Sequence, residues 1–137
     1  AVSPDGTFVL SGGAEGVVWA WSLASPGEHR TLGRHDDIVW DCAISPDGSF
    51  VVSASRDQTL RTWDTSSGEK RATFEGHTGP VSSCAVSPDS AFVVSGSSDH
   101  TLRLWDANDG AEAVDRTPFV GPLVMRVELS QVLQPAA

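Results

Sequence analysis

The chain of 137 residues has a formal net charge of −9, with 39% hydrophobic and 20% charged residues. This composition is too apolar for a disordered chain, and the negative charge argues against general binding to nucleic acids or anionic membranes, which requires a Lys/Arg surface. No signal peptide is recognisable, and no apolar run approaches the roughly 18 residues of a membrane-spanning helix. We therefore expect a soluble β protein without nucleic-acid or membrane partners.

The first third of the chain predicts short strands joined by turns. Residues 1–3 would end a strand, and Pro4-Asp5-Gly6 forms a tight turn because proline fixes φ and glycine supplies the left-handed position. Residues 7–11 and 17–21 are apolar and β-branched, which is typical of strands. Residues 29–32 predict a further short strand.

The rest of the chain repeats this order with a period of 42 residues, which separates His35 from His77 and Trp63 from Trp105. Four short strands per period, without helical periodicity, predict antiparallel sheets stacked side by side. The expected strands are residues 38–44, 50–53, 59–63, 70–74, 81–86, 92–95 and 101–105.

Particular residues recur within this period. Gly76-His77 opens a repeat, Trp63-Asp64 and Trp105-Asp106 close the third strand of theirs, and Asp57 and Asp99 lie six residues before the tryptophans. The chain thereby resembles the WD-repeat β-propellers over roughly residues 1–115. The resemblance implies an all-β fold, a partial β-propeller of four-stranded antiparallel blades in an open arc of about three blades.

The repeats divide the chain into an incomplete first blade (1–33), a second blade (34–75), a third blade (76–115) and a non-repeat C-terminal tail (116–137). In the tail, residues 125–130 alternate as in a strand, although a helical face also fits. Three repeats are too few to close a propeller of about four to eight blades. We therefore expect part of a longer WD-repeat protein, with self-association through open blade edges as a possibility.

The resemblance also implies a buried hydrogen-bond network in each complete blade. An aspartate can orient a histidine, the histidine can reach a serine, and the serine can accept an indole N–H, so that each buried polar group finds a partner. In the first blade Glu15 replaces the aspartate and the histidine segment is missing, so we expect an incomplete network there. The matching residues are His35, Ser53, Asp57 and Trp63, and His77, Ser95, Asp99 and Trp105.

The same residue types invite two other interpretations, a hydrolytic site or a metal site formed by His35, His77 and Asp57. A nucleophile requires exposure beside an oxyanion hole, whereas these serines lie within predicted strands of two successive repeats. Metal ligands must converge within about 2.0–2.2 Å of one ion, whereas these residues belong to different repeats. We therefore expect no enzymatic activity, no cofactor and no metal site.

The two cysteines, Cys42 and Cys84, occupy equivalent places in successive repeats. If the repeats stack as units, these residues are not close neighbours, and geometry argues against a disulfide between them. Buried free thiols fit a reducing compartment. We accordingly expect an intracellular protein, cytoplasmic or nuclear.

Residues that differ between repeats are better candidates for function than residues that recur, because fold requirements act alike on every blade. Trp40 replaces Ser82 in the innermost strand, and tryptophan is favoured at protein interfaces. Three further candidate partner-binding residues, Ala14, Arg56 and Ser98, each directly precede the acidic residue of the equivalent turn in their repeat. A fourth, Trp19, occupies the position that Arg61 and Arg103 occupy in the later repeats. We therefore expect a non-catalytic scaffold for protein partners; the alternatives are a self-assembling unit that completes a propeller and a regulatory fragment of a larger multidomain enzyme.

Overall fold

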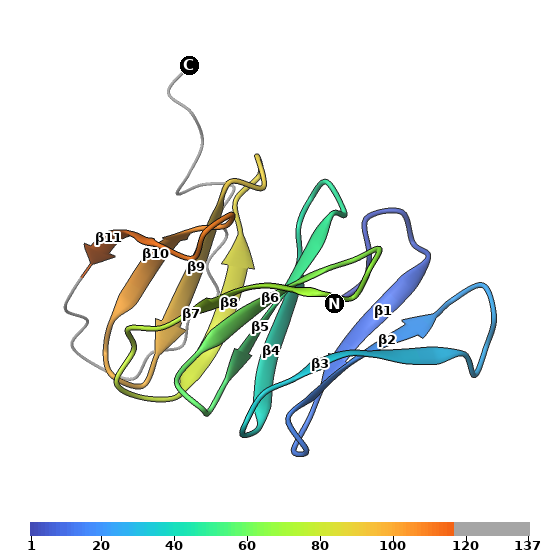
Figure 1. The fold of residues 1–137 in the computed structure, drawn as a ribbon, viewed down its shortest axis with the longest axis horizontal. Coiled ribbons are helices and arrows are strands. Elements are labelled where there is room, and N and C mark those ends of the chain that lie inside the picture. Colours follow the sequence, from blue (N-terminus) through green and yellow to red (C-terminus); the bar gives the residue numbers. More distant parts are fainter. Residues whose placement is uncertain (117–137) are drawn as a thin grey trace.

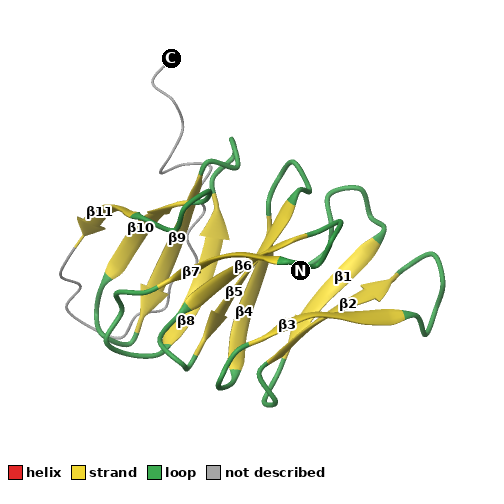
Figure 2. Ribbon diagram, in the orientation of Figure 1, coloured by secondary structure: helices red, strands yellow, loops and turns green. Residues whose placement is uncertain are grey.

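Three antiparallel β-sheets lie side by side in the computed structural model (Figure 1), which describes residues 1–116. The first sheet has three strands and the other two have four each. Strands and short turns make up this part of the chain (Figure 2), and it contains no helix long and apolar enough to span a membrane. The predicted all-β class with four-stranded antiparallel blades is confirmed.

The strands follow one another in chain order within each sheet. The strands predicted from residue 7 onward agree with them to within two residues at each end, whereas residues 1–3 form only an isolated bridge, from Val2 to Val9, and not a strand end. The expected tail strand at 125–130 lies outside the described residues. A fourth strand of the third sheet, β11, was given no bounds by the sequence analysis. The strands are β1 (Phe8–Gly12), β2 (Val17–Ser22), β3 (His29–Arg34), β4 (Val39–Ile44), β5 (Phe50–Ser55), β6 (Leu60–Asp64), β7 (Lys70–Phe74), β8 (Val81–Val86), β9 (Phe92–Ser97), β10 (Leu102–Asp106) and β11 (Glu112–Arg116).

Each Ser-Pro-Asp turn is closed by its own side chains. The Ser45 hydroxyl donates to Asp47 at 2.7 Å and accepts the backbone N–H of the first residue of β5 at 3.0 Å. Ser3 and Ser87 donate to their aspartates in the same way, and all three serines are buried. The turn recurs because one serine and one aspartate satisfy the backbone groups that it leaves open.

A β-bulge interrupts the first strand of both complete sheets. The register of β4 with β5 shifts around Trp40, and the register of β8 with β9 shifts around Ser82. A bulge inserts one extra residue, bends the strand and re-aims the side chain at that point. The two sheets thus share the same local geometry but carry different side chains there.

Two hydrophobic layers fill the spaces between the sheets. Successive side chains of a strand point to opposite faces, so alternate residues of β5 enter different layers. A tryptophan closes each layer against a glycine of the last strand of the preceding sheet or of the loop after it. A Cβ on Gly33, in β3, would overlap the Trp63 ring, and a Cβ on Gly76, after β7, would lie 3.2 Å from the Trp105 ring. The first layer contains Leu10, Val18, Ala20, Leu32, Val39, Val51 and Trp63, and the second contains Phe50, Val52, Ala54, Leu60, Phe74, Val81, Val93, Trp105 and Ala107.

The two outer faces of the array lack such cover from other parts of residues 1–116. Trp21 is 39% exposed, whereas its counterpart Trp63 is 5% exposed. Leu102 is partly exposed, whereas its counterpart Leu60 is 0% exposed. Equivalent positions are therefore fully buried only where a further sheet lies beside them.

Candidate functional site

Four side chains of the third sheet form one hydrogen-bonded chain. The Trp105 indole donates to the Ser95 hydroxyl at 2.8 Å, Ser95 Oγ lies 2.7 Å from His77 Nε2, and His77 Nδ1 lies 2.8 Å from Asp99 Oδ2. His77 is 5% exposed and Ser95 is 0% exposed. A neutral imidazole donates at one nitrogen and accepts at the other. Nδ1–H therefore donates to the carboxylate, and Nε2 accepts the serine proton.

The second sheet contains the same chain of contacts. The Trp63 indole donates to Ser53 at 3.1 Å, Ser53 Oγ lies 2.6 Å from His35 Nε2, and His35 Nδ1 lies 2.9 Å from Asp57 Oδ2. The four residues come from the loop before β4, from β5, from the turn after β5 and from β6. The network thus connects a loop and a turn to the interior of the sheet.

Two threonines that the sequence analysis did not single out also join these networks. Thr59 and Thr101 each donate to the aspartate of their turn at 2.6 Å. The backbone N–H groups of Asp36 and Thr78 donate to the same two carboxylates at 3.1 and 3.0 Å. The signal for the threonines was their recurrence at the period of 42, with Val17 at this position in the first repeat.

Burial and hydrogen bonding together set the protonation of the four titratable groups. Burial lowers the pKa of His35 and His77 by more than the neighbouring carboxylates raise it. Burial raises the pKa of Asp57 and Asp99, but hydrogen bonds from the threonines and histidines outweigh it, so the pKa of both carboxyls lies below its ordinary value. Each pair is therefore a neutral imidazole bonded to a carboxylate at neutral pH.

The networks contain no nucleophile that a substrate could reach. Ser53 and Ser95 are 0% exposed, within β5 and β9. Acyl transfer requires an accessible hydroxyl beside oxyanion donors, so this geometry does not fit a hydrolytic site. Among residues 1–112, whose side chains the structure describes, no group of three or more His, Cys, Asp or Glu is placed to hold a metal ion.

The first sheet contains one bond of the network and an aromatic cluster. The Trp21 indole donates to Ser11 at 2.8 Å, although Glu15 stands where the other sheets have aspartate. The Trp21 ring packs against His29 with ring centroids 4.7 Å apart, and Trp19 lies 6.1 Å from Trp21. Trp19, a candidate partner-binding residue, is thus half-buried within a cluster of aromatic rings.

The other candidate partner-binding residues lie along one rim of the array. Ala14, Arg56 and Ser98 are exposed and occupy equivalent turns, those after β1, β5 and β9. Because successive strands are antiparallel, these turns share a rim with the loop before β4. Arg56 lies 3.9 Å from Asp37 of that loop. Trp40, at the bulge near the beginning of β4, is 49% exposed.

Both cysteines are free thiols. Burial raises the pKa of Cys42 to about 12 and raises that of Cys84 well above its ordinary value, which suppresses thiolate chemistry. The expectation that equivalent residues of successive repeats are far apart is wrong for this region. The inner strands β4 and β8 lie side by side, and the Asp41 carboxylate accepts the Cys84 N–H at 3.0 Å.

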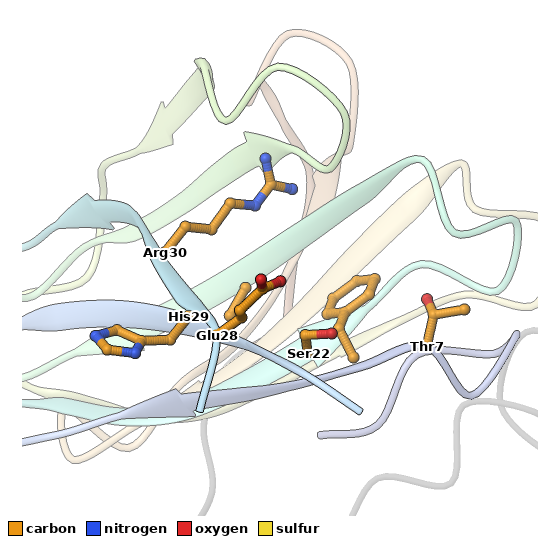
Figure 3. Close-up of a pocket in the computed structure, with 7 residues that line it drawn as sticks. Thr7, Ser22, Glu28, His29 and Arg30 are labelled. Atoms are coloured by element: carbon orange, nitrogen blue, oxygen red, sulfur yellow. The ribbon is translucent and has the colours of Figure 1, made fainter. Parts of the chain in front are cut away.

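A hollow of about 280 Å³ opens at the rim of the first sheet that lies opposite the turn containing Ala14 (Figure 3). Arg30 donates to the carbonyls of Thr65 and Ser66, which ties the first sheet to the second. The polar side chains labelled in Figure 3 are spread along the hollow and do not converge on one point. Its lining residues are Thr7, Phe8, Ala20, Ser22, Glu28, His29 and Arg30.

Comparison with known families adds sequence support to this geometry. The family model described as "WD domain, G-beta repeat" matches residues 1–22, 27–64 and 68–106. The chain belongs to the WD-repeat family. Comparison with curated proteins gives no match.

Solved structures of WD repeats share the fold. The chain is similar to a structure of the RRP9 WD40 repeats with a TM-score of 0.77 and 24% identity, covering 84% of this chain and 36% of that chain. It is similar to a structure of U3-55K with a TM-score of 0.77 and 25% identity, covering 85% of this chain and 37% of that chain. The chain thus spans little more than a third of either neighbour. Its fold is a partial β-propeller, as predicted.

The WD repeats and the sheets are out of step by one strand. The repeat matched at 27–64 contains β3 to β6, and the repeat matched at 68–106 contains β7 to β10. Each of these repeats therefore supplies the last strand of one sheet and the first three strands of the next. Neighbouring blades interlock because each is completed by the repeat that follows it.

Proposed function

We propose that this segment is a non-catalytic scaffold that binds protein partners at the rim containing Trp40. WD-repeat domains generally bind proteins, and the fold is generally non-catalytic. The observation that carries the proposal is the 49% exposure of Trp40 at a bulge. Aromatic side chains that become buried on binding contribute much of the binding energy at protein interfaces.

The third sheet supports this reading of Trp40. At the equivalent bulge, Ser82 is half-buried and donates to the Gly96 carbonyl at 3.3 Å. A small polar residue thus satisfies the fold at this position. The geometry of the bulge therefore does not require the large exposed indole of Trp40. Contact with a partner accounts for it.

A photo-crosslinking experiment tests the proposal. A photo-reactive amino acid replaces Arg56, which shares the rim, in chains with Trp40 intact and with Trp40→Ser. Lys70, exposed in the outermost strand of the same sheet, is the control position. We expect discrete cross-linked proteins from position 56 that disappear with Trp40→Ser. Identical cross-linking from positions 56 and 70, or cross-linking that ignores Trp40, would contradict the proposal.

Self-assembly is a second candidate function, supported by the partial exposure of Trp21 and Leu102 on the outer faces. Docking of a second copy would cover these side chains as a neighbouring sheet covers Trp63 and Leu60. The mass of the purified segment, measured by light scattering over a range of concentrations, separates the two candidates. A defined oligomer supports self-assembly, and a monomer at all concentrations contradicts it.

Localisation is part of the same proposal. Two free, half-buried cysteines support an intracellular protein, because reducing compartments keep thiols unpaired. Fractionation of cells that express the parent protein, followed by immunoblotting, checks this. Recovery from the secretory pathway would contradict it.

A further inference from the structure

The rim of the second sheet differs from that of the third in charge as well as in Trp40. Residues 36–41 read Asp-Asp-Ile-Val-Trp-Asp, whereas the equivalent residues 78–83 read Thr-Gly-Pro-Val-Ser-Ser. Three carboxylates and one indole therefore replace neutral, smaller groups within a single stretch. Both stretches precede and begin the same bulged strand, so the backbone does not require the acidic residues.

The three carboxylates are used differently. Asp41 accepts two backbone N–H groups, including that of Cys84 at 3.0 Å, and thereby links the second sheet to the third. The Asp36 side chain is 87% exposed and the Asp37 side chain is 43% exposed. Asp36 thus presents most of its side chain to solvent at the rim, and Asp37, which accepts the Ile38 N–H at 2.8 Å, presents less than half.

The nearby cations compensate this charge only in part. Arg56 lies 3.9 Å from Asp37, and Arg61 lies 3.4 Å from Asp36. Arg61 also lies 3.6 Å from Asp57 and donates to the Arg34 carbonyl at 2.6 Å, so its charge is shared with the buried network. Both pairs are long and their carboxylates are solvent-accessible, so they are weak and leave Asp36 and Asp37 available to a cation of a partner.

The indole and the carboxylates lie within reach of one extended segment. Trp40 follows Asp37 by three residues, and an extended chain spans at most about 3.3–3.6 Å per residue. Arg56 N–H donates to the Ile38 carbonyl at 2.9 Å, which holds the loop beside the neighbouring turn. A cation over an indole face is attracted by about 0.5–2 kcal/mol, depending on how far it is desolvated.

We infer that the partner segment at this rim is basic: a lysine or arginine side chain lies on the face of Trp40, and neighbouring cations pair with Asp36 and Asp37. The inference rests on the proposed function, because it names the chemistry of the partner for the same rim. The net charge of −9 favours approach of such a segment over long range. An acidic segment or a nucleic acid would meet like charge.

The test uses short fluorescent peptides and fluorescence anisotropy at low and at physiological salt. One peptide carries arginines and lysines separated by glycine and serine, a second carries glutamates in their place, and a third is uncharged. We expect the basic peptide to bind and the other two to bind at least tenfold more weakly, with affinity for the basic peptide falling as salt rises.

Trp40→Ser and Asp36→Thr combined with Asp37→Gly take their residues from the third repeat, so they are compatible with the bulge and loop. Trp40→Ser should weaken binding of the basic peptide about fivefold to tenfold, and Trp40→Leu should weaken it nearly as much because leucine lacks the π face. Asp36→Thr combined with Asp37→Gly should weaken it about fivefold and flatten the salt dependence. Glu28→Gln combined with Glu69→Gln removes the same charge at the opposite rim and should leave binding unchanged.

The outcomes separate this inference from the function on which it rests. Equal binding of basic and uncharged peptides, tighter binding of the acidic peptide or of a single-stranded oligonucleotide, or binding unaffected by Trp40→Ser would each overturn it. If the basic peptide fails but cross-linking from position 56 still depends on Trp40, the rim function stands and its assigned chemistry is wrong. Circular dichroism and the urea midpoint of each variant confirm that its fold is intact.

Discussion

Removal of one buried hydroxyl provides a sharp test of the hydrogen-bond network. Ser95→Ala deletes the oxygen that accepts the Trp105 indole N–H at 2.8 Å and lies 2.7 Å from His77 Nε2. Trp105 is 1% exposed and His77 is 5% exposed, so water cannot replace the lost partner. Each orphaned buried polar group costs about 1–3 kcal/mol. With two such groups, we expect the free energy of unfolding to fall by about 2–6 kcal/mol.

The first sheet supplies a matched control for this substitution. Ser11→Ala removes the same acceptor from Trp21, which is 39% exposed, so water can solvate the indole N–H. The expected loss is below about 1 kcal/mol. The two substitutions delete the same atom at equivalent positions and differ in the burial of the groups left behind.

Urea denaturation monitored by circular dichroism measures both losses. A double-mutant cycle of Ser95→Ala with Trp105→Phe isolates the coupling, because phenylalanine removes the orphaned donor and should recover part of the loss. Similar destabilisation by Ser95→Ala and Ser11→Ala would refute the reasoning. So would strict additivity in the cycle.

Three further predictions follow from the described contacts. Burial lowers the pKa of His35 and His77, so as the pH falls through about 6.5 these two histidines take up protons in the unfolded chain before they do so in the folded chain. The urea midpoint should therefore fall between pH 7 and pH 5, and less steeply in His77→Gln. A flat profile would contradict the assignment. Gly33→Ala would place a Cβ within the neighbouring tryptophan ring and should lower the free energy of unfolding by about 1–3 kcal/mol. The control, Gly13→Ala, meets no atom within 4 Å and should lower it far less. Equal melting temperatures of the two variants would show that the ring moves freely. Thr62 is 0% exposed, and its hydroxyl has no hydrogen-bond partner among the described residues, so Thr62→Val should raise stability by about 1 kcal/mol in a thermal melt, and a loss would reveal a partner for the hydroxyl.

Much of the fold could be predicted because the fold requirements recur in the sequence. The period of 42 residues marks equivalent turns and strands, and repetition in three copies separates residues that the fold needs from residues that vary. The turn serine and aspartate are of this kind, and so are the network histidine and tryptophan. The recurring threonine of the network carried the same signal and could have been found.

The remainder depends on neighbours that the sequence of one repeat does not specify. Trp21 and Trp63 occupy equivalent positions, yet one is 39% and the other 5% exposed, because a sheet covers only the second. The exposure of Trp40 depends on a bulge, and no residue type marks a bulge in the sequence. The approach of β4 to β8 depends on how the sheets converge along their inner strands.

The one-strand offset between repeats and sheets has a consequence for how such arrays grow. Duplication of a stretch equivalent to residues 27–64 would insert three strands of a new blade and the closing strand of its predecessor. The sheet begun by each inserted copy is then complete, since the next repeat supplies its fourth strand. Only a sheet at an end of the array can then lack a strand, and the number of blades can change in evolution without breaking any interior sheet.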